Sequence, residues 1–177
     1  LERIRQRFGR LDVHINSAAN FDRTPFATLS ERDWELALDT NLKGVFLCAQ
    51  AVGRVMRDQR HGKIVNIASI MGIVGLRYCS PYAAAKGGVI TLTKSLALEW
   101  ASYNVNVNAI APGFTRTPMT QSAIEDPTYY QELTRDTPFG RFAEPEEMVG
   151  ACLYLVSDAA NFVTGITIPV DGGYTAR

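Results

Sequence analysis

The segment KIVNIAS, residues 63–69, is a short apolar run that ends on a hydroxyl side chain, Ser69. Such a run is typical of a strand that is buried on both faces of a parallel sheet. Similar runs occur at LDVHINSAA (11–19), VNVNAIAPG (105–113) and ITIPVDGG (166–173). Helical patterns separate these runs, so the sequence predicts an α/β domain whose parallel sheet has helices on both faces.

The longest predicted helix covers residues 29–62. Ser30 is its expected N-cap, Asp33 occupies the capping-box position, and Gly62 is expected to end it. The other predicted helices cover residues 1–9, 81–102 and 145–158, and a looser stretch rich in proline spans 114–143. The chain has no internal repeat, so we expect a single domain over residues 1–177.

The composition excludes several classes of protein. The chain has 177 residues, of which 46% are hydrophobic, enough for one domain with a core. Acidic and basic residues balance at 18 each, so we expect no nucleic-acid partner. No apolar run reaches the ~18 residues of a membrane span. Cys48, Cys79 and Cys152 are widely spaced, which predicts no metal site and no disulfide framework and favours a reducing cytoplasm.

The segment SPYAAAKGG, residues 80–88, places Tyr82 four residues before Lys86. Ser80 is the expected N-cap of this helix, and Pro81 suits the first helical position. Residues four apart share a helix face. A nearby cation favours the tyrosinate and lowers the tyrosine pKa from about 10. The pair is therefore either a usable acid and base or incidental surface chemistry.

Ligands of parallel α/β sheets bind at the carboxyl ends of the strands. This rule selects residues 16–19, Ser69 and the turn at 112–113, and Tyr82 begins the helix after Ser69 at the same edge. Asn41 lies in the middle of a predicted helix, where asparagine is a poor helix former. It either holds a water, relieves a bent backbone, or is an ordinary buried amide.

Taken together, these segments resemble the short-chain dehydrogenase/reductase family over essentially the whole chain. Four residues match the family's catalytic tetrad in type, order and spacing: Asn41, Ser69, Tyr82 and Lys86. Three segments are similar to its Asn-Asn-Ala-Gly loop, its Pro-Gly segment and its closing strand: NSAA (16–19), NAIAPGFTRT (108–117) and VDGG (170–173). The resemblance implies a Rossmann-type, doubly wound parallel sheet.

The resemblance also implies an NAD- or NADP-dependent oxidoreductase that moves a hydride between nicotinamide and a secondary alcohol or ketone. Tyr82 would be the general acid and base, and Ser69 would donate a hydrogen bond to the same substrate oxygen. Lys86 would lower the pKa of Tyr82 and hold the nicotinamide ribose, and Asn41 would anchor a water that links Lys86 to solvent. The implied cofactor contacts, besides Tyr82 and Lys86, are Asn16, Ala18, Pro112, Gly113, Thr115 and Thr117.

The substrate is less well defined. The segments EWASYNVNVNAIAPG and VDGGYTAR look most like family members of the gluconate 5-dehydrogenase type, which act on sugar acids and polyols. Two alternatives remain open: a 3-oxoacyl carrier-protein reductase, and a non-catalytic protein that binds nucleotide or assembles. The family's usual assembly, a homotetramer built through the long helices and the last helix and strand, is also expected here.

The predicted wall of the substrate pocket comes from the segment after Ser69 and from the stretch 114–143. Its expected members are Ile70, Met71, Ile73, Val74, Phe114, Met119 and Phe142. Three arginines are candidates to meet a substrate carboxylate, against the alternative that each lies on the surface: Arg77, Arg116 and Arg141.

Two departures from the family pattern are visible. The segment NSAA has Ser17 and Ala19 where the family has asparagine and glycine. No glycine-rich phosphate loop opens the chain. The resemblance therefore implies that three strands and their helices, about 70–80 residues, precede Leu1.

A protein made only of residues 1–177 is expected to be inactive and poorly soluble. It would keep the nicotinamide half of the site, lose the pyrophosphate half, and leave strand 11–16 as a bare sheet edge. Expression of this segment alone, followed by sedimentation and an NAD(P)H absorbance assay, checks the expectation. A soluble and active protein of this length would contradict it.

Overall fold

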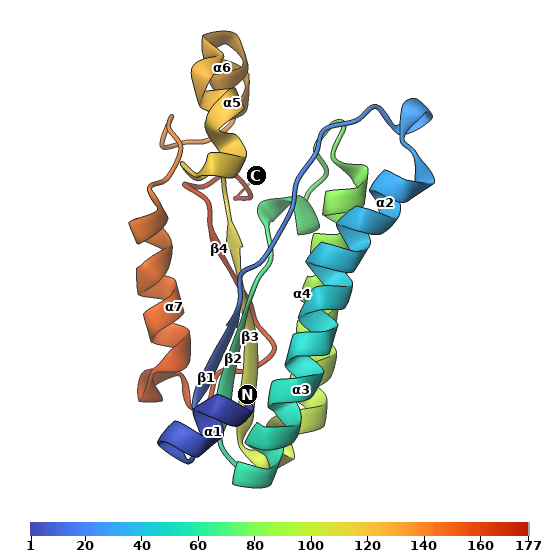
Figure 1. Cartoon of the computed structure of the whole chain (residues 1–177). Coiled ribbons are helices and arrows are strands. Elements are labelled where there is room, and N and C mark those ends of the chain that lie inside the picture. Colours follow the sequence, from blue (N-terminus) through green and yellow to red (C-terminus); the bar gives the residue numbers. More distant parts are fainter. Residues whose placement is uncertain (177) are drawn as a thin grey trace.

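The centre of the protein is a parallel sheet in which four strands follow chain order. The structure is a computed structural model that describes residues 1–176, so Arg177, at the end of the predicted domain, lies outside it. The strands are β1 (Val13–Asn16), β2 (Gly62–Ile67), β3 (Val105–Pro112) and β4 (Thr167–Val170). Each crossover between them contains helix, which confirms the Rossmann-type parallel sheet (Figure 1).

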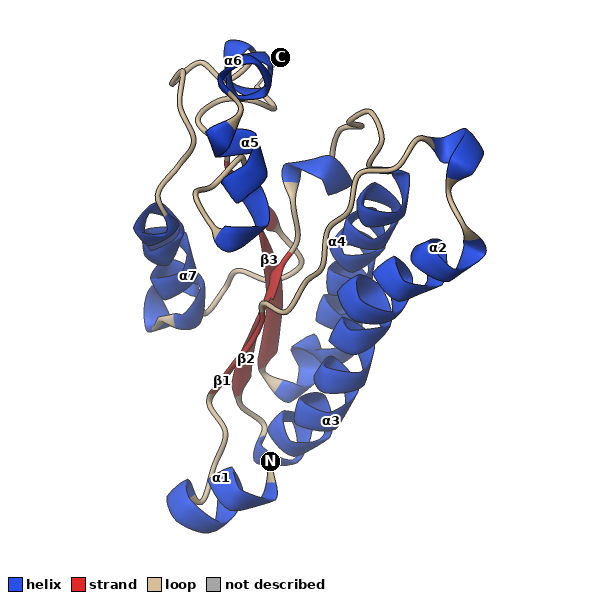
Figure 2. Ribbon diagram, turned by 45° about the horizontal axis from the view of Figure 1, so that its top comes forward, coloured by secondary structure: helices blue, strands red, loops and turns tan. Residues whose placement is uncertain are grey.

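Helices cover both faces of this sheet (Figure 2). On one face lie α3 (Gly44–Gln59) and α4 (Ser80–Trp100), and α7 (Val149–Val156) lies on the other. The remaining helices are α1 (Glu2–Phe8), α2 (Glu31–Leu38), α5 (Gln121–Glu125) and α6 (Pro127–Arg135). Among the described helices, none has both the length and the apolar character that a bilayer span requires.

Two hydrophobic layers hold the helices to the sheet. Neighbouring residues of a strand point to opposite faces, and β2 uses this directly. Ile64 packs with Val52 and Met56 of α3, whereas Val65 packs with Leu155 of α7. These five side chains are each less than 4% exposed. The alternation explains why β2 reads as a continuous apolar run in the sequence.

The helix predicted over residues 29–62 is interrupted near its middle. The α2 helix ends at Leu38, a π-helical turn spans Asp39–Lys43, and α3 begins at Gly44. A π-turn accommodates one extra residue in a helix and is common at functional sites. Asn41 lies inside this turn. The helix backbone is therefore distorted at Asn41, as one of the explanations for a mid-helix asparagine requires.

The ends of this helical run are partly as predicted. The Ser30 hydroxyl accepts a hydrogen bond from the Asp33 N–H at 3.1 Å, which confirms the N-cap. The predicted end at Gly62 is wrong, because Gly62 is the first residue of β2. The run ends at Arg60, whose φ of 55° is left-handed and turns the chain toward the strand.

The start of α4 also differs by one residue from the prediction. Cys79 is the N-cap, and Ser80 is already the first helical residue. The Ser80 hydroxyl is buried without a hydrogen-bond partner, so its predicted capping role is wrong. Pro81 follows within the first turn, where its missing N–H leaves no helical hydrogen bond unmade.

The stretch 114–143 is more ordered than the sequence indicated. It contains α5 and α6, which lie beyond the carboxyl ends of the strands (Figure 1). Asp126 caps α6 by accepting hydrogen bonds from the N–H groups of Thr128 and Tyr129, and Pro127 is its first residue. The sequence Asp126-Pro127 carries the signal for this helix start, an acceptor side chain at the N-cap followed by proline at the first helical position.

A row of buried polar side chains crosses from β1 to α4. The Asn16 amide donates to Asn66 Oδ1 at 2.8 Å, and the Asn66 amide donates to Thr93 Oγ1 at 2.9 Å. Thr93 in turn donates to the carbonyl oxygen of Val89 at 2.8 Å. Asn16 and Asn66 are also register partners in the sheet. The row therefore fixes the position of β1 relative to β2 and α4.

The variant Asn66→Ala is expected to lower the free energy of unfolding by about 1–3 kcal/mol, because it leaves the buried Asn16 amide without an acceptor. Urea denaturation of the full-length protein measures this change. Thr93→Val removes the next member of the row, so the two changes should combine non-additively. Additivity within about 0.3 kcal/mol would contradict a coupled row.

Candidate active site

A cavity of about 470 Å³ opens at the carboxyl ends of the strands. Four parts of the chain form its walls: the loop after β1, the segment from the end of β2 to the start of α4, the segment from the end of β3 through α6, and the turn at Pro145–Met148. Predicted site residues in this wall are Ser69, Tyr82, Lys86, Pro112, Gly113, Thr115 and Thr117. Residues far apart in the sequence are therefore brought together at the predicted edge of the sheet.

Tyr82 and Lys86 lie on one face of the first turns of α4. Lys86 is 1% exposed, and its ammonium donates to the carbonyl oxygen of Ile67 at 2.7 Å. The same ammonium lies 5.5 Å from the centre of the Tyr82 ring. Phe21, from the loop after β1, packs edge-to-face on the Tyr82 ring, with the two ring centres 5.1 Å apart. The phenol is thus held between two elements.

Burial controls the acid–base properties of this pair. It lowers the pKa of Lys86 from 10.5 to about 8. It also raises the pKa of Tyr82 above its usual value, against a smaller opposing effect of the hydrogen bond with Ser69. Burial therefore opposes the lowering of the Tyr82 pKa that the resemblance implied, and the role of Lys86 in that lowering stays a prediction. Burial costs the tyrosinate more solvation energy than the hydrogen bond with Ser69 restores.

Ser69 is held beside this pair by a close approach of backbone segments. It leaves the end of β2, and its Oγ accepts a hydrogen bond from the Met71 N–H at 3.1 Å. The turn that follows lies directly on α4, since a Cβ at Gly72 would lie 2.6 Å from the Lys86 carbonyl carbon. Only glycine allows this approach, which keeps Ser69 near Tyr82.

Asn41 is fully buried but lies outside the cavity wall. Its amide donates to the Asn20 carbonyl oxygen at 2.9 Å and to Asn20 Oδ1 at 2.7 Å, and its Oδ1 accepts from the Asn20 N–H at 3.0 Å. These three bonds fasten the loop after β1 to the π-turn. The water-anchoring role implied for Asn41 stays a prediction.

Two of the implied cofactor residues are also outside the wall. The Asn16 side chain is used in the polar row, and Ala18 is exposed in the loop, whereas Ser17 and Ala19 line the cavity.

Gly113, another residue of the cavity wall, is required because the backbone after β4 approaches it closely. A Cβ at this position would lie 2.8 Å from the Asp171 Cα.

The predicted pocket wall is correct for three residues, Met71, Phe114 and Met119. The other four are not in the wall. Phe142 and Ile70 are buried in the core, and Ile73 and Val74 are exposed. Phe142 packs instead on Tyr130 and Phe114, with ring centres 4.8 and 5.5 Å apart, and so supports α6 from below.

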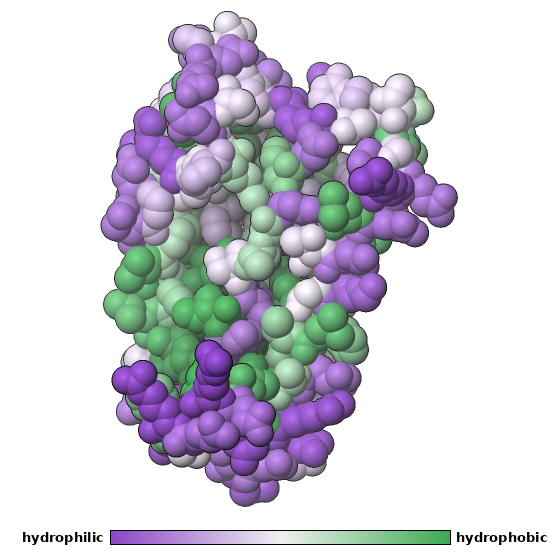
Figure 3. Space-filling model, viewed as in Figure 1, coloured by the Kyte–Doolittle hydropathy of each residue, from purple (hydrophilic) through white to green (hydrophobic). Residues whose placement is uncertain are grey.

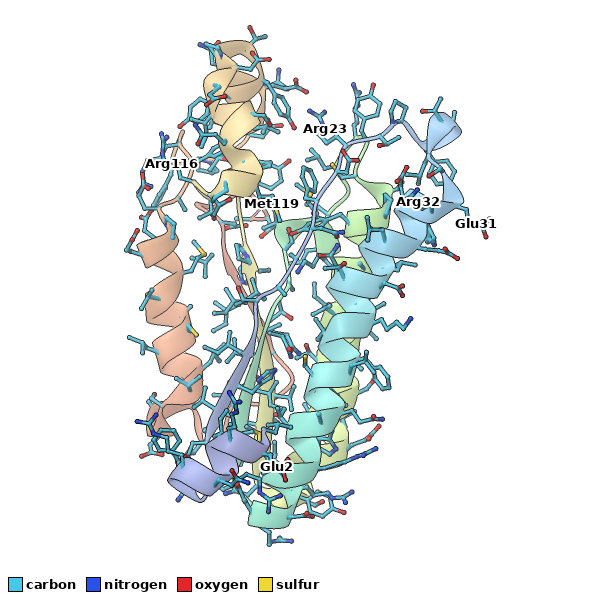
Figure 4. The ribbon with its side chains drawn as sticks, viewed as in Figure 1. Glu2, Arg23, Glu31, Arg32, Arg116 and Met119 are labelled. Carbon is cyan, nitrogen blue, oxygen red and sulfur yellow. The ribbon has the colours of Figure 1, made fainter. Side chains whose placement is uncertain are left out.

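None of the three candidate arginines reaches the cavity. Arg116 pairs with Glu144 at 3.1 Å, and Arg141 pairs with Glu147 at 2.7 Å. Arg77 is exposed. The ion pairs explain why Arg116 and Arg141 lie on the outer surface, because the glutamates there bind their guanidinium groups. Figure 4 shows Arg116 away from the sheet, on the outer side of the segment that leads to α5.

The arginine that lines the cavity is Arg23, in the loop after β1. Its guanidinium carbon lies 4.3 Å from the centre of the Tyr129 ring and 5.5 Å from that of Tyr78. Figure 4 places Arg23 in the gap between the lid formed by α5 and α6 and the upper end of the α2–α4 layer. Sequence reasoning missed it because no motif surrounds it and its partners are more than 50 residues away.

Within residues 1–176, no three side chains of His, Cys, Asp or Glu gather in a group that could hold a metal ion. The cysteines are free, with Cys79 buried, Cys152 half-buried and Cys48 exposed. The polar side chains in the cavity wall include hydroxyl, phenol, ammonium and guanidinium groups.

Comparison with known proteins identifies the family. The family described as enoyl-(acyl carrier protein) reductase matches residues 1–175. The 3-oxoacyl-[acyl-carrier-protein] reductase of Thermotoga maritima is 43% identical over 173 residues, which cover 98% of this chain and 70% of that protein. The chain belongs to the short-chain dehydrogenase/reductase family.

Other members of the short-chain dehydrogenase/reductase family are similar to the same extent. The 5-keto-D-gluconate 5-reductase of Escherichia coli is 39% identical over 98% of this chain and 68% of its own length. The gluconate 5-dehydrogenase of Burkholderia cenocepacia, solved with NADP and tartrate, is 38% identical, with a TM-score of 0.96 over 99% of this chain and 69% of that one. The chain thus spans somewhat more than two thirds of these relatives.

The variant Lys86→Met is expected to remove a pH-dependent part of the stability. Between about pH 8 and pH 10.5, the unfolded chain holds a proton on Lys86 that the folded chain has released. The contribution of Lys86 to the free energy of unfolding is therefore unfavourable at low pH and rises across this window. Urea denaturation of both proteins between about pH 7 and about pH 10 should show the difference, wild type minus variant, increasing with pH. A flat difference would contradict the lowered pKa.

Proposed function

We propose that the protein is an NAD(P)-dependent oxidoreductase that interconverts a secondary alcohol and a ketone, with a sugar acid as substrate. The observation that carries this proposal is the convergence of Ser69, Tyr82 and Lys86 on one cavity at the carboxyl ends of the strands. The family includes enzymes of this reaction type, and a solved relative binds NADP.

The residues around the cavity suit a nicotinamide cofactor. Lys86 presents a buried ammonium at the cavity wall, and Thr115 and Thr117 add hydroxyl groups on the opposite side. Next to these threonines, Pro112 and Gly113 form a part of the wall that has small side chains or none. A nicotinamide bound here supplies or accepts the hydride. The proposed contacts of the chain with it are Asn16, Ala18, Tyr82, Lys86, Pro112, Gly113, Thr115 and Thr117.

Proton transfer is assigned to Tyr82. Its raised pKa keeps the phenol protonated at neutral pH, as an acid that protonates a ketone oxygen must be. Ser69 donates a second hydrogen bond to the same oxygen as negative charge develops on it. Lys86 holds the positive charge nearby that stabilises the tyrosinate left after transfer. In the oxidative direction, the same tyrosinate removes the proton of the alcohol.

Asn41 completes the proposed tetrad from a distance. Its side chain is fully used in holding Asn20, so a water would be bound through the backbone of the π-turn. That water would connect the buried Lys86 ammonium to solvent and let the proton lost from Tyr82 be replaced.

A sugar acid is favoured by the charge within the cavity. Arg23 is the arginine in the wall, and within residues 1–176 no carboxylate forms an ion pair with it. Its buried Nε–H has no hydrogen-bond acceptor. A carboxylate in the cavity would supply that acceptor. The relatives from Escherichia coli and Burkholderia cenocepacia are named for gluconate or its keto acid.

The second candidate is reduction of a 3-oxoacyl group on an acidic carrier protein. The relative from Thermotoga maritima carries that name and is 43% identical. Such a partner would need unpaired basic groups at the mouth of the cavity. Arg116 and Arg141, on the outer surface of this region, are already paired with Glu144 and Glu147, which makes this candidate the weaker one.

A homotetramer in the cytoplasm is the proposed biological form. Large apolar side chains remain exposed on the helices that would form the interfaces: Phe46 and Leu47 of α3, Leu98 of α4, and Leu153 of α7. Figure 3 shows hydrophobic surface gathered over α7 and β1 on one side of the molecule. Three cysteines that form no disulfide fit a reducing compartment.

The variant Tyr82→Phe is expected to lower kcat by about 10²–10⁴-fold, because it removes the acid and base while keeping the ring. Cofactor affinity should change little. The measurement is NAD(P)H absorbance with the full-length protein, in which 5-keto-D-gluconate, polyols and 3-oxoacyl thioesters are each paired with NAD(H) or NADP(H). Tyr154→Phe, on the outer face of α7, is the matched control.

The substrate panel separates the alternatives. Turnover of keto acids supports the proposal, whereas exclusive turnover of 3-oxoacyl thioesters would replace it with the carrier-protein reaction. Cofactor binding without turnover of any substrate would indicate a non-catalytic protein.

A further inference from the structure

Arg23 connects two separate walls of the cavity. It belongs to the loop after β1, which the bonds between Asn20 and Asn41 fasten to the helical layer. Tyr129 belongs to α6, in the lid beyond the carboxyl ends of the strands. The contact between the Arg23 guanidinium and the Tyr129 ring, at 4.3 Å, therefore spans from the fixed part of the site to the lid.

The geometry of this contact leaves the arginine available to a ligand. A guanidinium that stacks over an aromatic ring uses its flat face, so the N–H groups along its edge remain free to donate. Arg23 and Tyr129 both line the cavity, and the buried Arg23 Nε–H has no acceptor. Burial raises the pKa of Tyr129, against smaller opposing effects of the Arg23 charge and of a hydrogen bond with Arg23, so the neutral hydroxyl also interacts with this arginine.

The attachment of the lid to the rest of the protein makes this contact significant. The core of the lid is Ala123, Leu133 and Phe142. Tyr130, next to Tyr129, points into that core and contacts Phe142. Both tyrosines pack against this core, but Tyr129 also contacts the Arg23 guanidinium, whereas Tyr130 contacts Phe142.

We propose that Tyr129 is a positioning residue for acidic substrates: its ring orients the Arg23 guanidinium so that the Nε–H edge receives the substrate carboxylate. This inference rests on the proposed function and deepens it. An acidic substrate uses the oriented Nε–H edge, and a neutral one does not.

The test uses four variants of the full-length protein: Tyr129→Leu, Tyr129→Phe, Arg23→Met and the double variant Arg23→Met with Tyr129→Leu. The acid probe is 5-keto-D-gluconate, and the neutral probe is L-sorbose, a ketose of the same carbon number. Binding of gluconate in the presence of NADPH, which cannot oxidise it, gives by calorimetry a second readout that needs no turnover. Tyr130→Leu is the matched control, since it disturbs the core of the lid without touching Arg23.

In Tyr129→Leu, KM for the acid should rise about tenfold, as expected for loss of one hydrogen bond to a charged group. Its kcat for the acid and its kcat/KM for the neutral ketose should change little. Tyr129→Phe keeps the ring and removes the hydroxyl that interacts with Arg23, so its KM for the acid should lie between those of wild type and Tyr129→Leu. In the Arg23→Met background, Tyr129→Leu should add nothing further.

Three results would overturn the inference: wild-type affinity for the acid in Tyr129→Leu, an equal loss for acid and neutral probes, or the same acid-selective loss in Tyr130→Leu. Failure of the proposed function appears separately, as wild-type enzyme that neither reduces the keto acid nor binds gluconate. In that case the inference falls with it.

Discussion

The hydrogen bond from the Lys86 ammonium to the Ile67 carbonyl oxygen joins α4 to the end of β2, and the site is arranged around it. An ammonium that is 1% exposed requires a strong acceptor, because an unpaired buried charge is very costly. The carboxyl end of a parallel strand provides one. Satisfying this group fixes the first turns of α4 over the sheet edge, which in turn fixes Tyr82 in the cavity.

Two kinds of close contact support this arrangement. Gly72 and Gly113 allow backbone segments to approach closely, so that the turn after Ser69 lies on α4 and the segment after β3 lies on the last strand. Buried amides do the rest: Asn66 ties β1 to α4, and Asn41 ties the loop after β1 to the π-turn. Hydrogen-bonded amides in a core fix the relative positions of the elements that they join, whereas apolar packing alone is less specific.

The site therefore has a sheet half and a lid half. The sheet half carries the proton chemistry at the end of β2 and the start of α4, beside the buried clusters between the sheet and its helices. The lid half consists of α5 and α6, which rest on a small cluster around Phe142. This division suits an enzyme of a family in which one reaction serves different substrates, since the lid can change while the reacting groups stay in place.

The order of elements and the reacting residues could be predicted from the sequence because their signals are local. The apolar run of residues 63–69 predicts a buried strand, and the spacing of Tyr82 and Lys86 places both on one helix face. Ser69 follows from its place at the end of that strand. The predicted N-cap at Ser80 was wrong because the helix begins one residue earlier, with Cys79 at the cap position and no side-chain cap hydrogen bond, and sequence patterns locate helix ends only to within one or two residues.

The sequence by itself determined the parallel sheet and the residues at the carboxyl edge, since these depend on periodicity and on strand ends, and the resemblance of several ordered motifs indicated the family. The tertiary structure alone decided which arginine enters the cavity, how Tyr129 meets it, and in which direction burial moves the pKa of Tyr82. The physical reason is that burial and charge contacts depend on segments that are distant in the chain. Arg23 and Tyr129 are separated by more than 100 residues and meet only because the fold brings the loop after β1 and α6 to one edge of the sheet.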